Sequence, residues 1–296
     1  MKAGFVALVG RPNAGKSTLL NRLVGTKLAI VSDKPQTTRN RIAAVKNYPE
    51  GQAVFVDTPG IHKPLHRMNV RMVDAAIEAM GDVDVVALIV DAAERSGAGD
   101  RYALGLASRA GAPVVLVLNK VDRIAKPKLL PMIDAWRQEH AFAEIVPVSA
   151  LTGENVDRLE QVLLRLLPDG EPRYPEDHLT DQPERFFVAE IVREQVLRHT
   201  HAELPYTSAV IVDRFEEPDA NGLMRLYCSI LVERPSQKPI VIGRAGEMIK
   251  RIGIGAREEL ERFFQARVFL DLRVKVESEW RDDERRLDEI LRRSEP

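Results

Sequence analysis

One stretch near the N-terminus, residues 10–17, constrains the fold of this chain more than any other. It reads Gly-Arg-Pro-Asn-Ala-Gly-Lys-Ser and fits the pattern G-x-x-x-x-G-K-[ST]. The apolar run 5–9 before it indicates a buried strand, and the run 18–23 after it indicates a helix with its leucines on one face. Glycines let the backbone curl so that its N–H groups point at phosphate oxygens, and the helix N-terminus adds positive potential. The stretch therefore predicts a nucleoside triphosphate site.

The loop residues have distinct predicted roles. Lys16 supplies a mobile cation for the outer phosphates, and Ser17 supplies a hydroxyl ligand for Mg²⁺. The nucleotide-binding residues predicted in this loop are Gly10, Arg11, Pro12, Asn13, Ala14, Gly15, Lys16, Ser17 and Thr18.

Two further oxygen ligands for Mg²⁺ are predicted downstream. The polar stretch 32–41 suits a loop in which a threonine ligates the metal only while the γ-phosphate is present. Thr38 is our first choice for that ligand and Thr37 our second. Asp57 ends the apolar run 53–56 and can hold the metal through water. The predicted metal ligands are Ser17, Thr38 and Asp57.

The residues after this aspartate bear on hydrolysis. Asp57, Thr58, Pro59 and Gly60 are predicted to contact the nucleotide, and the N–H of Gly60 makes the segment through Asn69 nucleotide-dependent. Ile61 stands where many GTPases carry a glutamine that orients the attacking water, so intrinsic hydrolysis is expected to be slow. Asn13 could help coordinate K⁺ near the transferred phosphate, although turn stabilisation is an equally good interpretation. The predicted catalytic residues are Lys16, Thr38, Gly60 and Asn13.

Two motifs after later strands predict which base is bound. A carboxylate at Asp122 can accept hydrogen bonds from guanine N1–H and N2–H₂, an edge that adenine lacks. Asn119 can tie neighbouring loops, Lys120 can lie over the base, and the backbone of 149–151 can donate to guanine O6. The predicted guanine-binding residues are Asn119, Lys120, Val121, Asp122, Ser149, Ala150 and Leu151.

The first half of the chain reads as an α/β domain. Apolar strand runs at 82–90, 114–118 and 145–148 alternate with helical patterns at 70–80, 102–110, 129–140 and 156–167. This order predicts a P-loop GTPase fold over residues 1–170, with a doubly wound, mostly parallel sheet. Ligands of such sheets bind beyond the carboxyl ends of the strands, where all of the motifs above fall.

At 296 residues the chain is long enough for a second domain. Proline, glycine and charge in residues 171–185 predict a linker. The order after it is helix (186–199), strand (209–212), strand (225–232), two helices interrupted at 253–255, and strand (268–276). With G-x-x-G at 243–246, this order predicts an α+β type II KH domain over residues 186–280.

The G-x-x-G backbone of KH domains approaches single-stranded RNA closely, beside an apolar groove for unstacked bases. Residues 234–262 hold seven Lys or Arg against four Asp or Glu, although the whole chain has a net charge of −1. The predicted RNA-binding residues are Lys238, Ile242, Gly243, Arg244, Ala245, Gly246, Lys250 and Arg251.

The remaining features place the chain in the cell. Cys228 is the only cysteine, so no internal disulfide can form, and no signal peptide or membrane-length apolar run is found. We therefore expect a cytoplasmic protein, without excluding peripheral membrane contact. Residues 281–296 are charged at most positions, and we interpret them as a solvated C-terminal helix whose apolar stripe is Leu287, Ile290 and Leu291.

Taken together, these motifs resemble the bacterial Era GTPase family over essentially the whole chain. The resemblance rests on the stretches 10–18, 36–39, 57–60, 119–122, 149–151, 203–206, 231–238 and 242–246. It implies a GTPase that uses Mg²⁺, binds GTP and GDP, and binds the 3′ end of 16S rRNA through its KH domain. It also implies help with assembly of the 30S subunit and association with the inner face of the membrane; we expect a monomer. Ala245 departs from the glycine often found at that position in the family.

Two other functions fit the residues less well. One is a nucleotide-controlled RNA-binding switch with negligible hydrolysis, which Ile61 favours. The other is a GTPase associated with tRNA modification, which lacks support because no second catalytic domain is evident and Cys228 lies within a strand.

Overall fold

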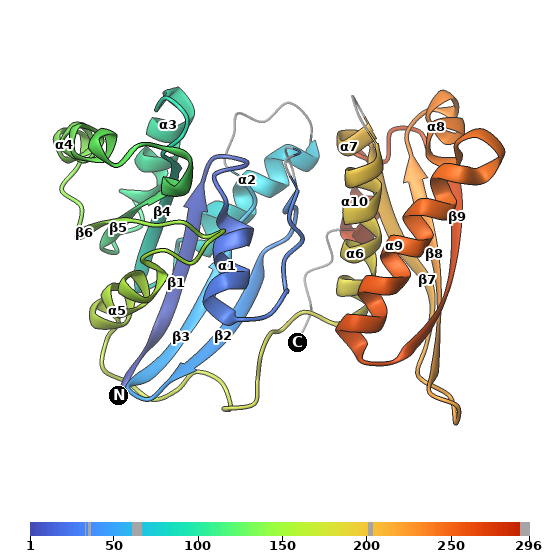
Figure 1. Ribbon diagram of the computed structural model, residues 1–296, viewed down its shortest axis with the longest axis horizontal. Coiled ribbons are helices and arrows are strands. Elements are labelled where there is room, and N and C mark those ends of the chain that lie inside the picture. The colour runs from blue at the N-terminus through green and yellow to red at the C-terminus, as the bar shows by residue number, and fades with distance from the viewer. Residues whose placement is uncertain (33, 35–36, 61–66, 201–203, 291–296) are drawn as a thin grey trace. The chain divides into compact units, whose positions relative to one another are not determined.

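The computed structural model describes residues 1–32, 34, 37–60, 67–200 and 204–290. Its contacts divide the chain into two compact units. The first contains residues 1–29, 38–65 and 69–181, and the second contains residues 30–37, 66–68 and 182–296. Figure 1 shows both, and each is described here by itself.

The first unit is built on a six-stranded sheet with the order β2-β3-β1-β4-β5-β6. All neighbouring strands are parallel except β2 and β3, which are antiparallel. Residues of β1, β3, β4 and β5 are almost all buried, as expected for a sheet covered on both faces. The strands are β1 (Lys2–Gly10), β2 (Ile42–Tyr48), β3 (Gly51–Asp57), β4 (Val85–Asp91), β5 (Val114–Asn119) and β6 (Glu144–Pro147).

Helices cover both faces of this sheet, which confirms the doubly wound prediction (Figure 1). Side chains of α2, α3 and α4 share one apolar cluster with β1, β4 and β5. Helices α1 and α5 contact each other and strands β1 and β3. The helices are α1 (Lys16–Val24), α2 (Arg67–Ala79), α3 (Ala98–Ala107), α4 (Leu129–Glu139) and α5 (Val156–Leu166), with short 3₁₀ turns at Val121–Arg123 and Lys126–Lys128.

Strand β2 is an element that the sequence prediction missed. It contains Ala43 and Ala44, which have little preference for strands, and it pairs only with β3 within the sheet. Residues of the predicted linker lie against it: the N–H of Val45 donates to Leu179 O at 2.9 Å, and Thr180 Oγ1 donates to Ala43 O at 2.7 Å. Hydrogen bonds therefore hold residues 179 and 180 against β2.

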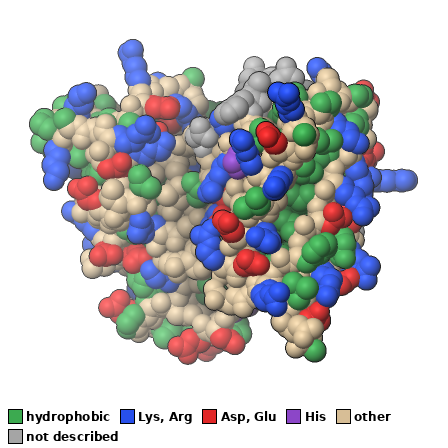
Figure 2. All heavy atoms as spheres, turned by 45° about the vertical axis from the view of Figure 1, so that its right-hand side comes forward, with side chains coloured by type: hydrophobic (Ala, Val, Ile, Leu, Met, Phe, Trp, Pro, Cys, Tyr) green, Lys and Arg blue, Asp and Glu red, His purple; other side chains and the backbone are tan. Residues whose placement is uncertain are grey.

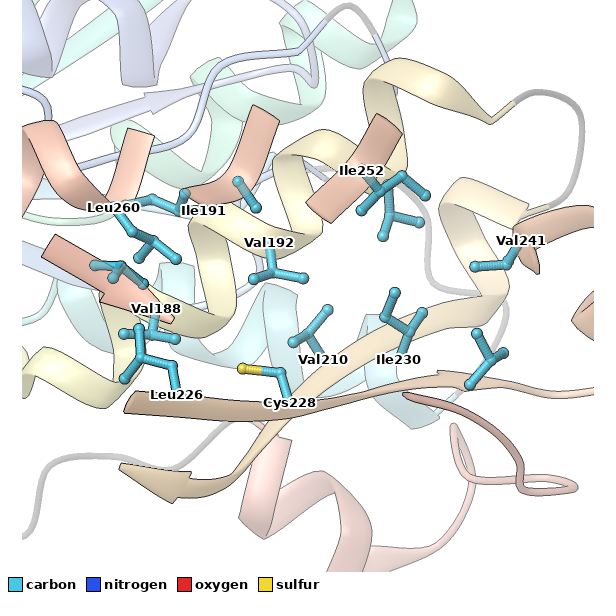
Figure 3. Close-up of a cluster of buried hydrophobic side chains, with 14 of the residues drawn as sticks. Val188, Ile191, Val192, Val210, Leu226, Cys228, Ile230, Val241, Ile252 and Leu260 are labelled. Carbon is cyan, nitrogen blue, oxygen red and sulfur yellow. The ribbon is translucent and has the colours of Figure 1, made fainter. Parts of the chain in front are cut away.

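The second unit is a three-stranded sheet, β7-β8-β9, in which β7 and β8 are antiparallel and β8 and β9 are parallel. Helices α6 and α9 pack on one face, where the side chains in Figure 3 form its core. The elements are α6 (Glu184–His199), α7 (Leu204–Thr207), β7 (Ser208–Glu216), β8 (Leu223–Val232), α8 (Lys238–Ile242), α9 (Glu247–Phe264), β9 (Arg267–Val276) and α10 (Glu284–Ile290), with 3₁₀ turns at Pro235–Gln237 and Arg244–Gly246.

The predicted interruption at 253–255 is wrong, because α9 runs without a break. A Cβ at Gly255 would lie 2.6 Å from Gln195 Oε1 of α6. Glycine at this position therefore allows close helix packing instead of ending the helix. The second of the two middle KH helices is α9, and the first is the short α8 before the G-x-x-G loop.

The prediction that the C-terminal helix is solvated is also wrong, because part of its apolar stripe is buried. Leu287 of α10 is fully buried and α10 contacts β7. Trp280, just before it, is fully buried, and its indole N–H donates to Thr207 O at 3.1 Å. Leu291 lies outside the described residues. Leu287 was the residue in the sequence that could have indicated this packing, because one apolar side chain is enough to attach a short helix to a core.

Candidate nucleotide site and glycine clamp

The phosphate loop joins β1 to α1, as predicted. Asn13 has φ 63° and Gly15 has φ 94°, both in the left-handed region that asparagine and glycine tolerate best. A Cβ at Gly15 would lie 2.3 Å from Asn119 Nδ2. The loop is therefore closed against Asn119, a predicted guanine-binding residue, and only glycine fits at this position.

Lys16 lies inside the loop with its charge largely removed from solvent. Its ammonium donates to Gly10 O at 3.1 Å and to Arg11 O at 2.9 Å. Burial lowers the pKa of Lys16 to about 8, and attraction to Asp57 opposes that shift. These two carbonyls hold the Lys16 ammonium inside the loop, where a bound phosphate could accept its hydrogen bonds instead.

The three predicted metal ligands lie together. Ser17 Oγ lies 2.6 Å from Thr38 Oγ1 and donates to Asp57 Oδ2 at 2.8 Å. Thr38 is the threonine that belongs to this cluster, since Thr37 Oγ1 instead donates to Lys34 O at 2.6 Å. Burial raises the pKa of Asp57 to about 6, opposed by Lys16 and by donors that include both hydroxyls. Thr38, our first choice, therefore lies beside Ser17 and Asp57, and Thr37 makes a different contact.

These side chains fit a magnesium ion. Mg²⁺ prefers hydroxyl, carboxylate and water oxygens, and it keeps much of its water shell. Asp57 Oδ1 is buried and has no hydrogen-bond partner among the described residues. An oxygen of this kind is suited to a metal-bound water. Ser17, Thr38 and Asp57 would hold the ion, consistent with our prediction.

The remaining loop residues act in different ways. The side chain of Arg11 donates to Asp100 at 2.9 Å and to Glu94 at 2.7 Å, so it anchors the loop to the start of α3. A Cβ at Gly60 would lie 2.8 Å from Pro12, which places this glycine beside the phosphate loop as expected. Thr58 Oγ1 donates to Leu8 O at 2.8 Å.

Ile61 lies outside the described residues. Thr18 is within the first turn of α1.

The side chains of Asn119 and Lys120 connect the loop after β5 to the phosphate loop. Asn119 Nδ2 donates to Ala14 O at 2.9 Å, and its Oδ1 accepts from the N–H of Ala150 at 3.0 Å. Lys120 Nζ donates to Asn13 O and Asp91 Oδ2, each at 2.6 Å. These four bonds connect the loops that follow β1, β4, β5 and β6, which lie at one edge of the sheet.

Asp122 and Ser149 lie side by side, with Ser149 Oγ donating to Asp122 Oδ1 at 2.5 Å. Val121 is buried and can act only through its backbone, whereas Leu151 is exposed. Arg22 of α1 also belongs to this edge, because its side chain donates to the carbonyls of Ala150, at 3.1 Å, and of Leu151. Sequence reasoning missed Arg22, which follows no motif and reads as a solvated helix position.

The G-x-x-G loop of the second unit lies between α8 and α9. Gly243 has φ 76°, and a Cβ there would lie 2.6 Å from Met248 Cβ. Gly246 has φ 80° with nothing within 4 Å of the same position. Ala245 has φ 50°, in the left-handed region that alanine rarely adopts. The loop backbone is therefore closely packed at Gly243 and open at Gly246.

Basic side chains surround this clamp, which we define as residues 243–246. The predicted RNA-binding residues Lys238, Arg244, Lys250 and Arg251 are exposed, and Ile242 is half-buried. Apolar Ile240 and Ile254, on the flanking helices, are also exposed. Figure 2 shows Lys and Arg side chains interspersed with hydrophobic ones on the face that this view brings forward. Such a surface suits a phosphate backbone that carries unstacked bases.

Comparison with known proteins decides the family. The family model described as "50S ribosome-binding GTPase" matches residues 5–120, and the KH domain model matches residues 203–281. GTPase Era of Geotalea daltonii is 52% identical over 97% of both chains, and that of Geotalea uraniireducens is 50% identical over 98% of this chain and 97% of its own. The chain belongs to the Era GTPase family.

Two solved Era structures agree with this assignment. A single-residue variant of Aquifex aeolicus Era, bound to GDP·AlF₄⁻, superposes with a TM-score of 0.94 at 41% identity, covering 98% of this chain and 99% of its own. Era in complex with MgGDPNP and nucleotides 1506–1542 of 16S rRNA gives 0.95 at 41% identity, covering 98% of each chain. These matches confirm the predicted fold, a P-loop GTPase unit followed by a KH unit.

As a member of the Era family, the chain hydrolyses GTP to GDP and phosphate. Water attacks the γ-phosphate in line with the leaving oxygen. Lys16 is buried, and it and the loop N–H groups would stabilise the charge on the phosphate oxygens. A Mg²⁺ ion held by Ser17, Thr38 and Asp57 would supply further positive charge to the phosphates. Asp122 and Asn119 are the residues predicted to orient guanine.

Among the described residues, no helix is both long and apolar enough to cross a membrane. Cys228 is buried in the core of the KH unit, where its pKa is raised by burial and by two nearby aspartates. Its side chain in Figure 3 packs among valines and leucines. It therefore serves packing and offers no reactive thiol at the surface.

Proposed function

We propose that this GTPase binds the 3′ end of 16S rRNA through the clamp 243–246 and assists assembly of the 30S subunit, with GTP setting when the RNA is held. The observation that carries the proposal is the clamp itself: open glycine backbone at Gly246 with basic side chains on both flanking helices. An Era relative that is 41% identical over 98% of this chain was crystallised with this RNA.

The two alternative functions have less support. The chain matches GTPase Era of Geotalea daltonii over 97% of both lengths, which favours an Era-type function over tRNA modification. A switch without hydrolysis would not need a buried Lys16 in the phosphate loop together with the cluster of Ser17, Thr38 and Asp57. We therefore favour a hydrolysing switch whose turnover releases the RNA.

A matched pair of glycine variants tests RNA binding. Gly246→Asp should place a carboxylate against the RNA backbone and lower affinity for a 16S 3′-end oligonucleotide about 100-fold or more. Gly222→Asp is the control, because Gly222 in the β7–β8 turn also has a positive φ, 70°, and nothing within 4 Å. Both variants should bind GTP normally. Equal RNA affinity of Gly246→Asp and Gly222→Asp, measured by fluorescence anisotropy, would refute the clamp assignment.

The catalytic role of Asn13 belongs to the same proposal. We place K⁺ beside the side chain of Asn13, where it would supply positive charge to the transferred phosphate. The left-handed φ of 63° at Asn13 equally suits a turn residue. Single-turnover hydrolysis in matched K⁺ and Na⁺ buffers tests this assignment, and equal rates would remove it.

The cellular setting is also proposed. We place the protein in the cytoplasm as a monomer, with peripheral contact to the inner face of the membrane. Light scattering with and without GTP checks the monomer. Flotation with anionic vesicles checks the membrane contact, and its absence at physiological salt would leave a purely cytoplasmic protein.

The domain limits follow the same logic. We propose a GTPase domain at 1–170, a linker at 171–185, a KH domain at 186–280 and a tail at 281–296. The compact units instead divide between Asp181 and Gln182. Limited proteolysis tests which limit holds, since a free linker would be cleaved between 171 and 181.

A further inference from the structure

Helix α6 carries an unusual set of buried polar side chains. Four polar residues of this helix are at least nine-tenths buried: Glu190, Arg193, Glu194 and Gln195. Charged side chains are seldom buried to this extent unless they are paired. Removing charges from water costs several kcal/mol per ion unless they are paired and hydrogen-bonded. We call Glu190, Arg193 and Glu194 the α6 polar cluster. Its hydrogen bonds indicate which part of the molecule it stabilises.

The cluster binds backbone groups of residues 30–37, which belong to the same compact unit. Arg193 forms two bonds with Glu190, at 2.7 and 2.8 Å, and also donates to Thr37 O. Glu194 Oε1 accepts from the N–H of Val31 at 3.1 Å and from Arg198 at 3.2 Å. The charged groups therefore hold this segment at two points, six residues apart.

The segment also carries its own hydrogen bonds. The N–H of Lys34 donates to Ser32 Oγ at 3.1 Å, and Thr37 Oγ1 donates to Lys34 O. Because the peptide between Thr37 and Thr38 is planar, a bond to Thr37 O also fixes the start of Thr38. Thr38 then places its hydroxyl 2.6 Å from Ser17 Oγ. The α6 polar cluster thus acts one peptide away from a residue of the metal cluster.

We propose that Arg193 and Glu194 are positioning residues for GTP hydrolysis. They hold the backbone at Val31 and at Thr37 so that the Thr38 hydroxyl stays among the metal ligands, and Glu190 keeps the Arg193 guanidinium oriented. The proposal rests on the role of Thr38 as a metal ligand. Because a threonine at this position ligates the metal only when the γ-phosphate is present, the cluster acts on the triphosphate state and spares the diphosphate state.

Two variants of the full chain test this assignment. Glu190→Gln/Arg193→Gln removes both charges of the pair at similar volume. Glu194→Leu removes the acceptor for Val31, and its partner Arg198 is half exposed and can turn to solvent. Each should lower kcat for GTP about tenfold and weaken binding of a non-hydrolysable GTP analogue by a similar factor, the effect expected for losing a charge-assisted hydrogen bond. Affinity for GDP should not change.

Controls separate positioning from a structural role. Arg185→Ala, an exposed arginine on the same helix, should change neither nucleotide. Arg193→Lys keeps a cation beside Glu190 and should recover part of kcat. Loss of GDP and GTP analogue affinity in equal measure by both test variants, or unchanged kcat in both, would overturn the proposal. Should the double variant not fold, Glu194→Leu decides alone.

Thr38→Ala distinguishes this proposal from the metal role on which it rests. If Thr38→Ala selectively weakens the GTP analogue while neither test variant does, Thr38 keeps its role and the positioning proposal fails. If Thr38→Ala has no selective effect, the metal assignment itself fails, whatever the cluster variants show.

Discussion

Each unit of this protein places a glycine loop before a helix, yet the two loops are built in opposite ways. In the phosphate loop, a Cβ at Gly15 would lie 2.3 Å from Asn119, and Lys16 is buried. In the clamp, nothing lies within 4 Å of the same position at Gly246, and the lysines and arginines nearby are exposed. Both loops offer backbone and positive charge, but only the first is enclosed by protein.

The difference follows from what each loop holds. A loop that promotes phosphoryl transfer needs donors fixed in a dry site, where electrostatic interactions are stronger than in water. A loop that holds a polynucleotide must let a long chain approach and leave, so its backbone faces solvent. The enclosed loop should therefore be sensitive to any added atom, and the open loop only to added charge.

Gly15→Ala should have the largest effect on this contrast. The new methyl group would collide with Asn119, whose amide is itself fixed by Ala14 and Ala150, and φ 94° would be strained for alanine. We expect GTP and GDP affinity to fall at least about 100-fold, since overlap and strain together cost several kcal/mol. Fluorescent-nucleotide titration measures the loss.

Gly25→Ala is the matched control for this prediction. Gly25 has φ 80° at the C-cap of α1 but nothing within 4 Å. It should lose about 1 kcal/mol of stability and no nucleotide affinity. If the two variants bind nucleotide alike, strain and not enclosure controls the phosphate loop.

Asp122→Asn should change which base the enclosed site accepts. An amide can still accept from Ser149 Oγ at this position, but it presents an N–H₂ group to the purine edge. Preference should move from GTP to XTP by about 100-fold, the scale of one mispaired buried hydrogen-bond edge. Hydrolysis assays with both nucleotides test this, and Asp134→Asn, an exposed aspartate, serves as control. Unchanged preference would remove Asp122 from base recognition.

The buried carboxylate of the enclosed site should make the nucleotide-free protein sensitive to pH. Burial raises the pKa of Asp57 to about 6, whereas in the unfolded chain this carboxyl titrates near about 3.9. Between these values the folded state binds more protons, so this residue's contribution to stability falls as pH rises from about 4 to about 6. The pKa of about 6 marks where that loss is complete.

Asp57→Asn removes this effect and isolates it. The free energy of unfolding of the variant, minus that of the wild type, should grow by on the order of 2 kcal/mol between pH 4.5 and pH 7, in the absence of nucleotide and Mg²⁺. Urea unfolding at several pH values measures it. A constant difference would mean that Asp57 stays charged and stabilised throughout.

Sequence reasoning anticipates the surroundings of the phosphate loop better than it anticipates tertiary contacts elsewhere in the chain. Spacing alone predicts the neighbours of the phosphate loop, because each motif follows a parallel strand and all such ends meet at one edge. It misses Arg22 and the α6 polar cluster, since ordinary helix positions acquire roles only through tertiary contacts. It misreads Gly255 as a helix break because a local pattern cannot show that Gln195 lies against it. Strand β2 is missed because Ala43 and Ala44 carry no strand preference.

Ala245→Gly should have the smallest effect and bears on the open loop. Alanine at φ 50° carries about 1 kcal/mol of left-handed strain, and glycine relieves it while adding freedom to the unfolded chain. The net gain in stability should be at most about 0.5 kcal/mol. Because nothing in the clamp encloses the bound backbone, RNA affinity should change by less than about threefold, or about 0.7 kcal/mol.

Gln265→Gly provides the comparison at the other end of α9, where φ is 51°. It relieves the same strain far along the helix from the clamp, although it also loses a side-chain bond to Arg262 O. Anisotropy titration with the 16S oligonucleotide should show equal affinity for wild type and Gln265→Gly. A tenfold or larger gain confined to Ala245→Gly would show that the third clamp position contacts RNA as tightly as Gly15 contacts Asn119, and the contrast between open and enclosed loops would then fail.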